Sequence, residues 1–306
     1  EYNGSKVEFV IIDEASMIDT YLMASLLKGI SSNCKVILVG DDHQLPSVGP
    51  GQVLHDLIES HALQVVELTE LYRQGIDSNI ISLAYDIRNQ SVNKDIFNVE
   101  DDLTFIECRD NEVIPNICEI CNTYKDLNYK KFQILAPMYK GLNGIDAINK
   151  NVQDIFNSKS RTKKEKVIGE FNFREDDKVI QLTNMPDDNV YNGDIGIIDR
   201  IQSSPKSEIH IDFDGNLVKY TPANFINFRS AYSISIHKAQ GSEFDVVVIP
   251  IVNAYNKMLY QKLIYTGVTR AKKKLYIVGD FSALIRASHN TSDDIRRTTI
   301  KNYLIL

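Results

Sequence analysis

The stretch FVIIDEAS, residues 9–16, decides the fold of this chain. Four apolar residues lead directly into two adjacent carboxylates, Asp13 and Glu14. A short apolar run of this kind predicts a buried strand, which places both carboxylates at its carboxyl end. Open α/β sheets bind their ligands at that edge. The stretch therefore predicts a parallel sheet with polar chemistry at its carboxyl edge.

The residues around this stretch alternate between strand-like and helix-like patterns. Apolar runs at 35–40 and 65–68 predict strands, and the amphipathic stretches 20–30, 51–60 and 78–89 predict helices. Strands that alternate with helices indicate βαβ units and a parallel sheet. We assign residues 1–92 to this first α/β domain.

The same alternation restarts near residue 93 and is interrupted once. Residues 167–228 contain short alternating strands separated by Asn-Gly, Asp-Gly and Ser-Pro turns, which predict a small antiparallel β-barrel. The α/β pattern resumes after it, so the second α/β domain is discontinuous, built from 93–166 and 229–306. The polar tract 158–166 is interpreted as a loop, and a solvated charge run is favoured there over a phosphate-binding patch.

Composition excludes several classes of protein. The 306 residues are 43% hydrophobic and 25% charged, as in ordinary globular proteins. Apolar runs are too short for membrane spans and no signal-peptide pattern occurs, so we expect a cytoplasmic protein without a membrane partner. The net charge of −7 argues mildly against a protein that coats nucleic acid, but leaves room for a local basic channel. Cys118 and Cys121 fall on a predicted helix without a second ligand pair, which disfavours a metal or redox site.

The two carboxylates have the layout of a Walker B strand in a P-loop ATPase. A strand-end Asp13 can hold Mg²⁺, and the adjacent Glu14 can orient a hydrolytic water. The alternative is a pair that caps the following helix, because acidic side chains also suit helix N-termini.

Three further segments offer polar chemistry at predicted strand ends or helix starts. The loop GDDHQLPSVGPG, 40–51, follows a buried strand and carries Gln44, whose two-ended amide can sense a phosphate and relay to another group. In 68–75, Tyr72 can stack on a base and Arg73 can reach a phosphate, although a core tyrosine and a helix-start arginine are equally compatible. In 265–275, Thr269 and Arg270 lie at or near a helix, and Arg270 can act as an arginine finger.

The stretch SISIHKAQGSEFDVVVI, 233–249, places a polar turn between two strands. His237 and Lys238 can meet a phosphodiester backbone, whereas Gln240, Gly241 and Glu243 can meet the ribose and phosphates of a nucleotide. A lone histidine in this position is more often structural.

Taken in order, these motifs resemble superfamily 1 helicases. The order is acidic strand end, G-D-x-x-Q-L, Y-R-Q, H-K-x-Q-G-x-E and V-T-R-A. The wording is most similar to the RecD-like branch, including the RecD/TraA type labelled exodeoxyribonuclease V alpha subunit. The resemblance covers essentially the whole chain and implies P-loop NTPase domains of the RecA-like kind, the first of them partial.

The resemblance also implies roles. Asp13 corresponds to the Mg²⁺-associated aspartate and Glu14 to the catalytic base. Gln44 matches the γ-phosphate sensor, and Arg73 and Arg270 match the arginines that approach that phosphate. The remaining matches are Tyr72, Gln240, Gly241 and Glu243 near the nucleotide, and His237, Lys238 and Thr269 near single-stranded DNA. The family implies ATP-driven 5′ to 3′ movement on single-stranded DNA, in DNA recombination and repair, and leaves room for partner subunits from those processes.

One departure is large, because no G-x-x-x-x-G-K-S/T phosphate loop occurs in the 306 residues. We expect the chain to be the C-terminal portion of a longer helicase and to lack ATPase activity by itself. We also expect the sheet edge beside residues 9–12 to be exposed or filled by something non-native. Two alternatives stay open. One is a non-catalytic nucleic-acid-binding or assembly module with relic motifs, and the other is an RNA-directed superfamily 1 helicase.

Overall fold

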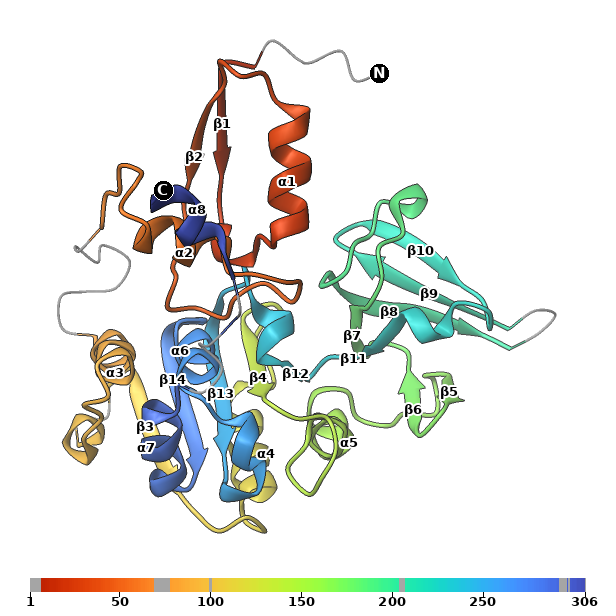
Figure 1. The fold of residues 1–306 in the computed structure, drawn as a ribbon. Helices are drawn as coiled ribbons and strands as arrows, with labels where there is room; N and C mark the ends of the chain where they lie inside the picture. The colour runs from red at the N-terminus through yellow and green to blue at the C-terminus, as the bar shows by residue number, and fades with distance from the viewer. Residues whose placement is uncertain are drawn as a thin grey trace.

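The computed structural model describes residues 7–68, 78–98, 101–203, 207–291, 296 and 298–305. The N-terminal part is a small α/β layer (Figure 1). Its sheet contains two parallel strands, β1 (Phe9–Ile12) and β2 (Lys35–Leu38), in register from Phe9 opposite Lys35 to Ile12 opposite Leu38. The helices are α1 (Thr20–Gly29), which begins at the Asp19 cap, and α2 (Val53–Glu59).

The second sheet is parallel throughout and has the order β12-β4-β13-β14-β3. Its strands are β3 (Leu103–Glu107), β4 (Phe132–Ala136), β12 (Ser233–Ser235), β13 (Phe244–Ile251) and β14 (Ala271–Gly279). Every residue of β4 is buried, as expected for a central strand that helices cover on both faces. The strands of this sheet come from both sides of the inserted segment.

Two groups of helices pack on this sheet. One group contains α3 (Asn79–Arg88), α6 (Gln261–Val268) and α7 (Phe281–His289), which contact one another. The other contains α4 (Val113–Tyr124) and α5 (Ile145–Phe156). Leu83 and Ile87 of α3 belong to the same hydrophobic core as the five strands. Packing therefore places α3 with the second sheet, although the sequence-based division assigned residues 1–92 to the first domain.

The inserted segment forms a separate antiparallel sheet with its own core. The order is β10-β9-β8-β7-β11. Its strands are β7 (Lys178–Gln181), β8 (Ile195–Gln202), β9 (Glu208–Phe213), β10 (Asn216–Tyr220) and β11 (Phe228–Ser230). A hairpin of β5 (Glu165–Ile168) and β6 (Phe171–Arg174) precedes it. The strand pairings leave β10 and β11 at the two edges, so the predicted barrel is observed as a five-stranded sheet beside a hairpin.

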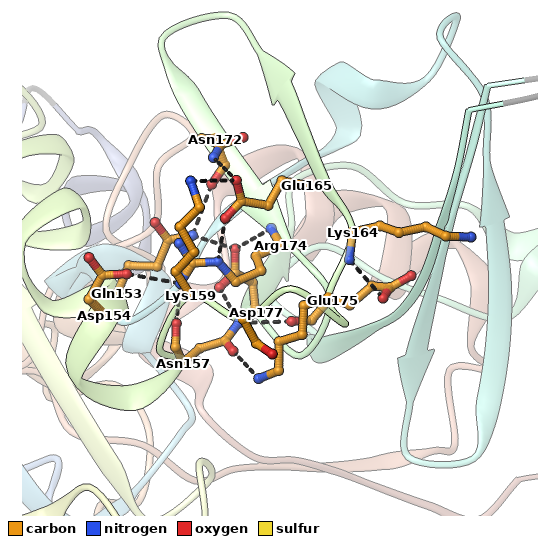
Figure 2. Close-up of polar contacts among 12 residues, drawn as sticks. Gln153, Asp154, Asn157, Lys159, Lys164, Glu165, Asn172, Arg174, Glu175 and Asp177 are labelled. Carbon is orange, nitrogen blue, oxygen red and sulfur yellow. Dashed lines mark hydrogen bonds and ion pairs between the residues drawn. The ribbon is translucent and has the colours of Figure 1, made fainter.

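A buried polar cluster joins this antiparallel sheet to helix α5. The Asp177 carboxylate accepts hydrogen bonds from Gln153 Nε2 and Asn157 Nδ2, both at 2.7 Å (Figure 2). It also accepts one from the Tyr232 hydroxyl at 2.9 Å and one from the Arg174 backbone amide at 2.7 Å. Four donors on one fully buried carboxylate fix the inserted sheet against the second domain.

The N-terminal sheet leaves one face uncovered. Phe9 is 54% exposed and Ile11 is 68% exposed, and Ile37 beside them on β2 is 46% exposed. Among the described residues β1 pairs only with β2, so its other edge carries no strand there. The expected exposure beside residues 9–12 is confirmed.

One predicted strand is wrong. Residues 65–68 are not in a strand, and Val66 is 73% exposed. A β-propensity run forms a strand only where a neighbouring strand supplies hydrogen bonds, and none lies against these residues in the described part of the chain. Across the ranges given above, no helix combines the length and apolar character needed to cross a membrane.

Candidate functional site

The turn after β1 holds the two carboxylates in an unusual backbone conformation. Glu14 has φ 51° and ψ 40°, the left-handed region that a non-glycine residue occupies only at a cost of about 1–3 kcal/mol. Its amide donates to Asp13 Oδ1 at 2.9 Å, and the Ala15 amide donates to the Val39 carbonyl at 2.9 Å. The strained turn points to function, because a simple helix cap does not require it.

The loop that follows β2 packs directly against this turn. At Gly40, an added Cβ would lie 2.9 Å from the Ala15 nitrogen and 3.1 Å from the Ser16 nitrogen. Only glycine allows that approach, so Gly40 sets the distance between the carboxylate turn and the loop. Further along the loop, Gln44 Nε2 donates to Asp41 Oδ2 at 3.3 Å.

Leu45 anchors the same loop in the second domain. Its side chain is 1% exposed and belongs to the core of the five-stranded sheet. The Leu45 amide donates to Thr266 Oγ1 at 2.8 Å, and the Leu45 carbonyl accepts from Gln240 Nε2 at 2.9 Å. The loop therefore follows the first sheet in the chain, but its Leu45 packs in the core of the second sheet.

Helix α6 presents one face to this loop. Lys262 Nζ donates to the Asp42 carbonyl at 2.9 Å, the Tyr265 hydroxyl donates to Asp41 Oδ2 at 2.9 Å, and Thr266 accepts from Leu45. The spacing i, i+3, i+4 puts these three side chains on one helix face.

Arg270 follows α6 and reaches the Gln44 side chain. Its Nη2 donates to Gln44 Oε1 at 3.1 Å and to Thr269 Oγ1 at 3.2 Å. Its Nε and Nη1 donate to the carbonyls of Thr266 and Ser242, at 3.1 and 3.2 Å. Burial lowers the pKa of Arg270, and the carboxylates of Glu14, Glu243 and Asp41 oppose that shift. A buried guanidinium thus lies within electrostatic reach of the strand-end Glu14.

The polar turn before β13 contributes the other predicted residues. Gly241 adopts φ +73°, and Glu243 forms an ion pair with Lys272 at 2.8 Å. Lys238 Nζ contacts Asn192 Oδ1 in the loop before β8, which places the inserted sheet beside this turn. Burial lowers the pKa of Lys238. His237 is exposed.

The structure brings six of the twelve predicted site residues together. Gln44, Gln240, Thr269 and Arg270 form one connected set of contacts through Leu45 and Thr266, with Glu14 and Glu243 in its electrostatic surroundings. Gln240 Nε2 bonds Leu45 rather than facing an open site. Tyr72 and Arg73 lie outside the described residues.

The sequence reasoning missed the residues that support this set. They are Asp41, Leu45, Lys262, Tyr265 and Thr266. The i, i+3, i+4 spacing of Lys262, Tyr265 and Thr266 on a predicted helix was a usable signal for these three.

The donor set fits a magnesium nucleotide without a dedicated metal cage. Asp13 is exposed at the strand end, and a single carboxylate completed by phosphate oxygens and water is how Mg²⁺ is commonly held. No group of three or more His, Cys, Asp or Glu side chains arranged to hold a metal is found in the described ranges. Cys118 and Cys121 are free thiols, and burial raises the pKa of both.

Three families match successive parts of the chain. Residues 3–111 match an AAA domain, residues 148–213 match the SH3 domain of ATP-dependent RecD-like DNA helicases, and residues 230–278 match the UvrD-like helicase C-terminal domain.

Two similar proteins are described as a RecD2 helicase and a RecD subunit. The ATP-dependent RecD2 DNA helicase of Deinococcus radiodurans is 31% identical over 90% of this chain and 37% of its own length. The RecBCD enzyme subunit RecD of Buchnera aphidicola is 26% identical over 91% of this chain and 54% of its own. The chain thus spans between about a third and about half of these relatives.

Solved structures show the same fold. A Bacteroides Pif1 helicase in complex with ADP-AlF3 and single-stranded DNA aligns with TM-score 0.54 at 20% identity, covering 90% of this chain and 71% of that one. A Candida albicans Pif1 helicase aligns with TM-score 0.53 at 17% identity, covering 94% and 76%. The AAA, RecD-type SH3 and UvrD-like helicase matches follow one another along the chain, which is similar to the RecD2 DNA helicase and to the RecD subunit over 90% and 91% of its length.

Proposed function

We propose that this chain supplies the hydrolytic and DNA-coupling half of an ATP-driven, single-stranded-DNA helicase that acts in recombination and repair. The observation that carries the proposal is the 3.1 Å contact between Gln44, on the loop after the first sheet, and Arg270, at the end of α6 on the second. A phosphate sensor and an arginine finger that meet across two parallel sheets suit a nucleotide bound between those sheets.

In this proposal each residue has one task. Asp13 would hold Mg²⁺, and Glu14 takes a proton from the attacking water. Arg270 stabilises the negative charge that develops on the transferring phosphoryl group, since a buried guanidinium acts strongly there. ATP bound with Mg²⁺ supplies the phosphoryl group, and these side chains orient it.

The DNA-coupling part of the proposal rests on the second polar turn. His237, Lys238 and Thr269 lie on segments that adjoin the Gln44–Arg270 contact, so a shift of that contact moves them too. The contact between Lys238 and Asn192 brings the inserted sheet to the same surface. We assign residues 1–92, 93–166 with 229–306, and 167–228 as the three domains, with α3 packed on the second.

The test compares Arg270→Ala and Arg270→Lys with Arg286→Ala in the intact protein. Arg286 is a suitable control because it is exposed on α7 and contacts Asn253. We expect both Arg270 variants to lower DNA-stimulated ATP turnover by about 10³-fold or more while nucleotide binding persists. Turnover that survives both changes would remove Arg270 from the hydrolytic site. An intact protein that binds DNA without any turnover would instead support a non-catalytic module, and greater stimulation by RNA than by DNA would indicate an RNA-directed enzyme.

A second arm tests residues 1–306 alone. Because no phosphate loop occurs in this sequence, we expect no ATP turnover with or without single-stranded DNA. Measurable DNA-stimulated turnover by these residues would contradict the assignment of the site.

A further inference from the structure

The side-chain amide of Gln44 is held at both ends. Nε2 donates to Asp41 Oδ2 at 3.3 Å, and Oε1 accepts from Arg270 Nη2 at 3.1 Å. An amide has a donating end and an accepting end, so it can meet these two partners in only one orientation. A flipped amide would set Oε1 against the Asp41 carboxylate and Nε2 against the Arg270 guanidinium.

Asp41 is itself fixed in place. Its Oδ1 accepts from the His43 backbone amide at 2.9 Å, and its Oδ2 accepts from the Tyr265 hydroxyl at 2.9 Å. Burial and the Asp41 carboxylate raise the pKa of Tyr265, so its hydroxyl remains a donor at neutral pH. The carboxylate therefore has partners from its own loop and from α6, and cannot turn away from Gln44 without losing them.

We propose that Asp41 and Tyr265 are positioning residues that lock the Gln44 amide with its oxygen toward Arg270. Within the described part of the chain, the lock leaves the second Nε2 hydrogen as the one side-chain donor that Gln44 still has to offer. A lone N–H donor beside a guanidinium suits an anionic oxygen, such as one on the terminal phosphate of a nucleotide. This last step rests on the proposed function, whereas the lock itself rests only on the contacts among these residues.

The lock predicts that the effect of Asp41→Asn on the loop changes sign with the residue at position 44. Packing alone predicts no such change. With Gln44 in place, Asp41→Asn is unfavourable, because it sets an amide N–H group against the groups that donate to Asp41. These are the His43 amide, Gln44 Nε2 and the Tyr265 hydroxyl. In the Gln44→Glu background, the same Asp41→Asn change removes a carboxylate–carboxylate repulsion and supplies a donor. The effect of Asp41→Asn should therefore reverse between the two backgrounds, a coupling expected of residues in contact.

The Leu45 amide is the reporter for this experiment. It is buried and bonds Thr266 across the two sheets, so its hydrogen exchange reports opening of the contact between loop and helix. The measurement is amide exchange by NMR on residues 1–306 without nucleotide, for the wild type, both single variants and the double variant. Tyr265→Phe is added, because it removes one donor to Asp41 and leaves the ring in place.

We expect Asp41→Asn to speed exchange of the Leu45 amide about fivefold in the wild-type background, and to slow it in the Gln44→Glu background. Tyr265→Phe should speed it in the wild-type background. Asp42→Asn is the matched control, because the Asp42 carboxylate contacts His43 and His55 rather than Gln44. The control should have the same effect in both backgrounds.

An Asp41→Asn effect of the same sign and size in both backgrounds would overturn the lock. If a single variant fails to fold, the double variant still decides between the outcomes: recovery of wild-type exchange supports the lock, and failure to recover overturns it. A sign reversal together with an intact protein that lacks ATP turnover would uphold the lock and overturn the proposed function instead. The two claims can thus fail separately.

Discussion

Arg296 Nη1 donates to the carbonyl oxygen of Gly49 at 2.8 Å, although the two residues are 247 positions apart. The same nitrogen donates to the Gly51 carbonyl at 2.9 Å. Helix α8 (Ile300–Ile305) packs on α2 just beyond it, and Lys301 pairs with Glu59 at 3.2 Å. The C-terminal residues thus hold the far end of the loop that carries Gln44, opposite the end held by α6.

Arg296→Ala should loosen that end of the loop. Two hydrogen bonds from a charged donor are lost, each worth about 1.5–3 kcal/mol in favourable settings. We expect amide exchange at Ser47, Val48, Gly49 and Gly51 to rise about tenfold or more, with the Leu45 amide changing less. Arg286→Ala is the control on α7. Equal exchange rates in the variant and the wild type would show that the Arg296 contact does not hold the loop.

Lys238 should contact a DNA phosphate, and this contact should make single-stranded DNA binding depend on salt concentration. Each phosphate neutralised on a single strand contributes about 0.7 to the slope of log affinity against log salt. We expect Lys238→Ala to weaken single-stranded DNA binding and to reduce that slope by about 0.7. Lys273→Ala is the control, because Lys273 already pairs with Asp245 at 3.0 Å. An unchanged slope in Lys238→Ala would remove Lys238 from the proposed DNA surface.

Lys178 should make the stability of the protein depend on pH. Its Nζ donates to the carbonyls of Tyr129 and Phe132 and to Gln133 Oε1, at 2.7, 3.0 and 2.9 Å. Burial lowers the pKa of Lys178 to about 7, and Lys178 lines a pocket of about 290 Å³.

The sign of this dependence follows from proton binding. An unfolded lysine has a pKa of about 10.4, so between about pH 7 and pH 10 the unfolded chain holds a proton that the folded chain has released. The free energy of unfolding should therefore rise with pH across that window. Lys178→Met should flatten the rise in urea unfolding midpoints between about pH 7 and pH 9, whereas Lys273→Met should keep it. A rise that persists in Lys178→Met would contradict the assignment.

Asp177→Asn should weaken the junction between the inserted sheet and α5. Each of the two carboxylate oxygens accepts two hydrogen bonds, so the amide nitrogen of an asparagine would face two of these four donors. We expect a loss of about 2–3 kcal/mol in the free energy of unfolding, measured in urea. The neighbouring Asp176→Asn should cost far less, because Asp176 is exposed and its carboxylate pairs with Lys163 at the surface. Equal costs for the two changes would show that the buried cluster is not the source.

The sequence was sufficient for the parts of the fold that depend on local pattern. The parallel strands, the amphipathic helices and the inserted antiparallel segment follow from periodicity and turn residues. The strand predicted at residues 65–68 is wrong because a strand needs a neighbouring strand to pair with, and a linear pattern does not reveal one. Helix α3 was assigned to the first domain for the same reason, since only its packing with α6 and α7 shows which core it joins.

Sequence motifs predicted the site residues, but they did not predict the residues that support them. Asp41 and Tyr265 have ordinary sequence surroundings, and their roles depend on a contact between residues 224 positions apart. Leu45 resembled any single apolar residue in a loop, yet it is buried in the core of the other domain. Long-range contacts of this kind are set by tertiary packing. Motifs in the sequence therefore predicted Gln44 and Arg270 as site residues, but did not predict Asp41, Tyr265 and Leu45, which support them.

The most direct test of the account is the single-stranded-DNA-stimulated ATP turnover of the intact protein with Glu14→Gln. The change keeps the size of the side chain and removes the base, so we expect turnover to fall by about 10²–10⁴-fold while nucleotide and DNA binding remain. Turnover at the wild-type rate would contradict the central claim that the strained turn after β1 is the hydrolytic centre of a helicase.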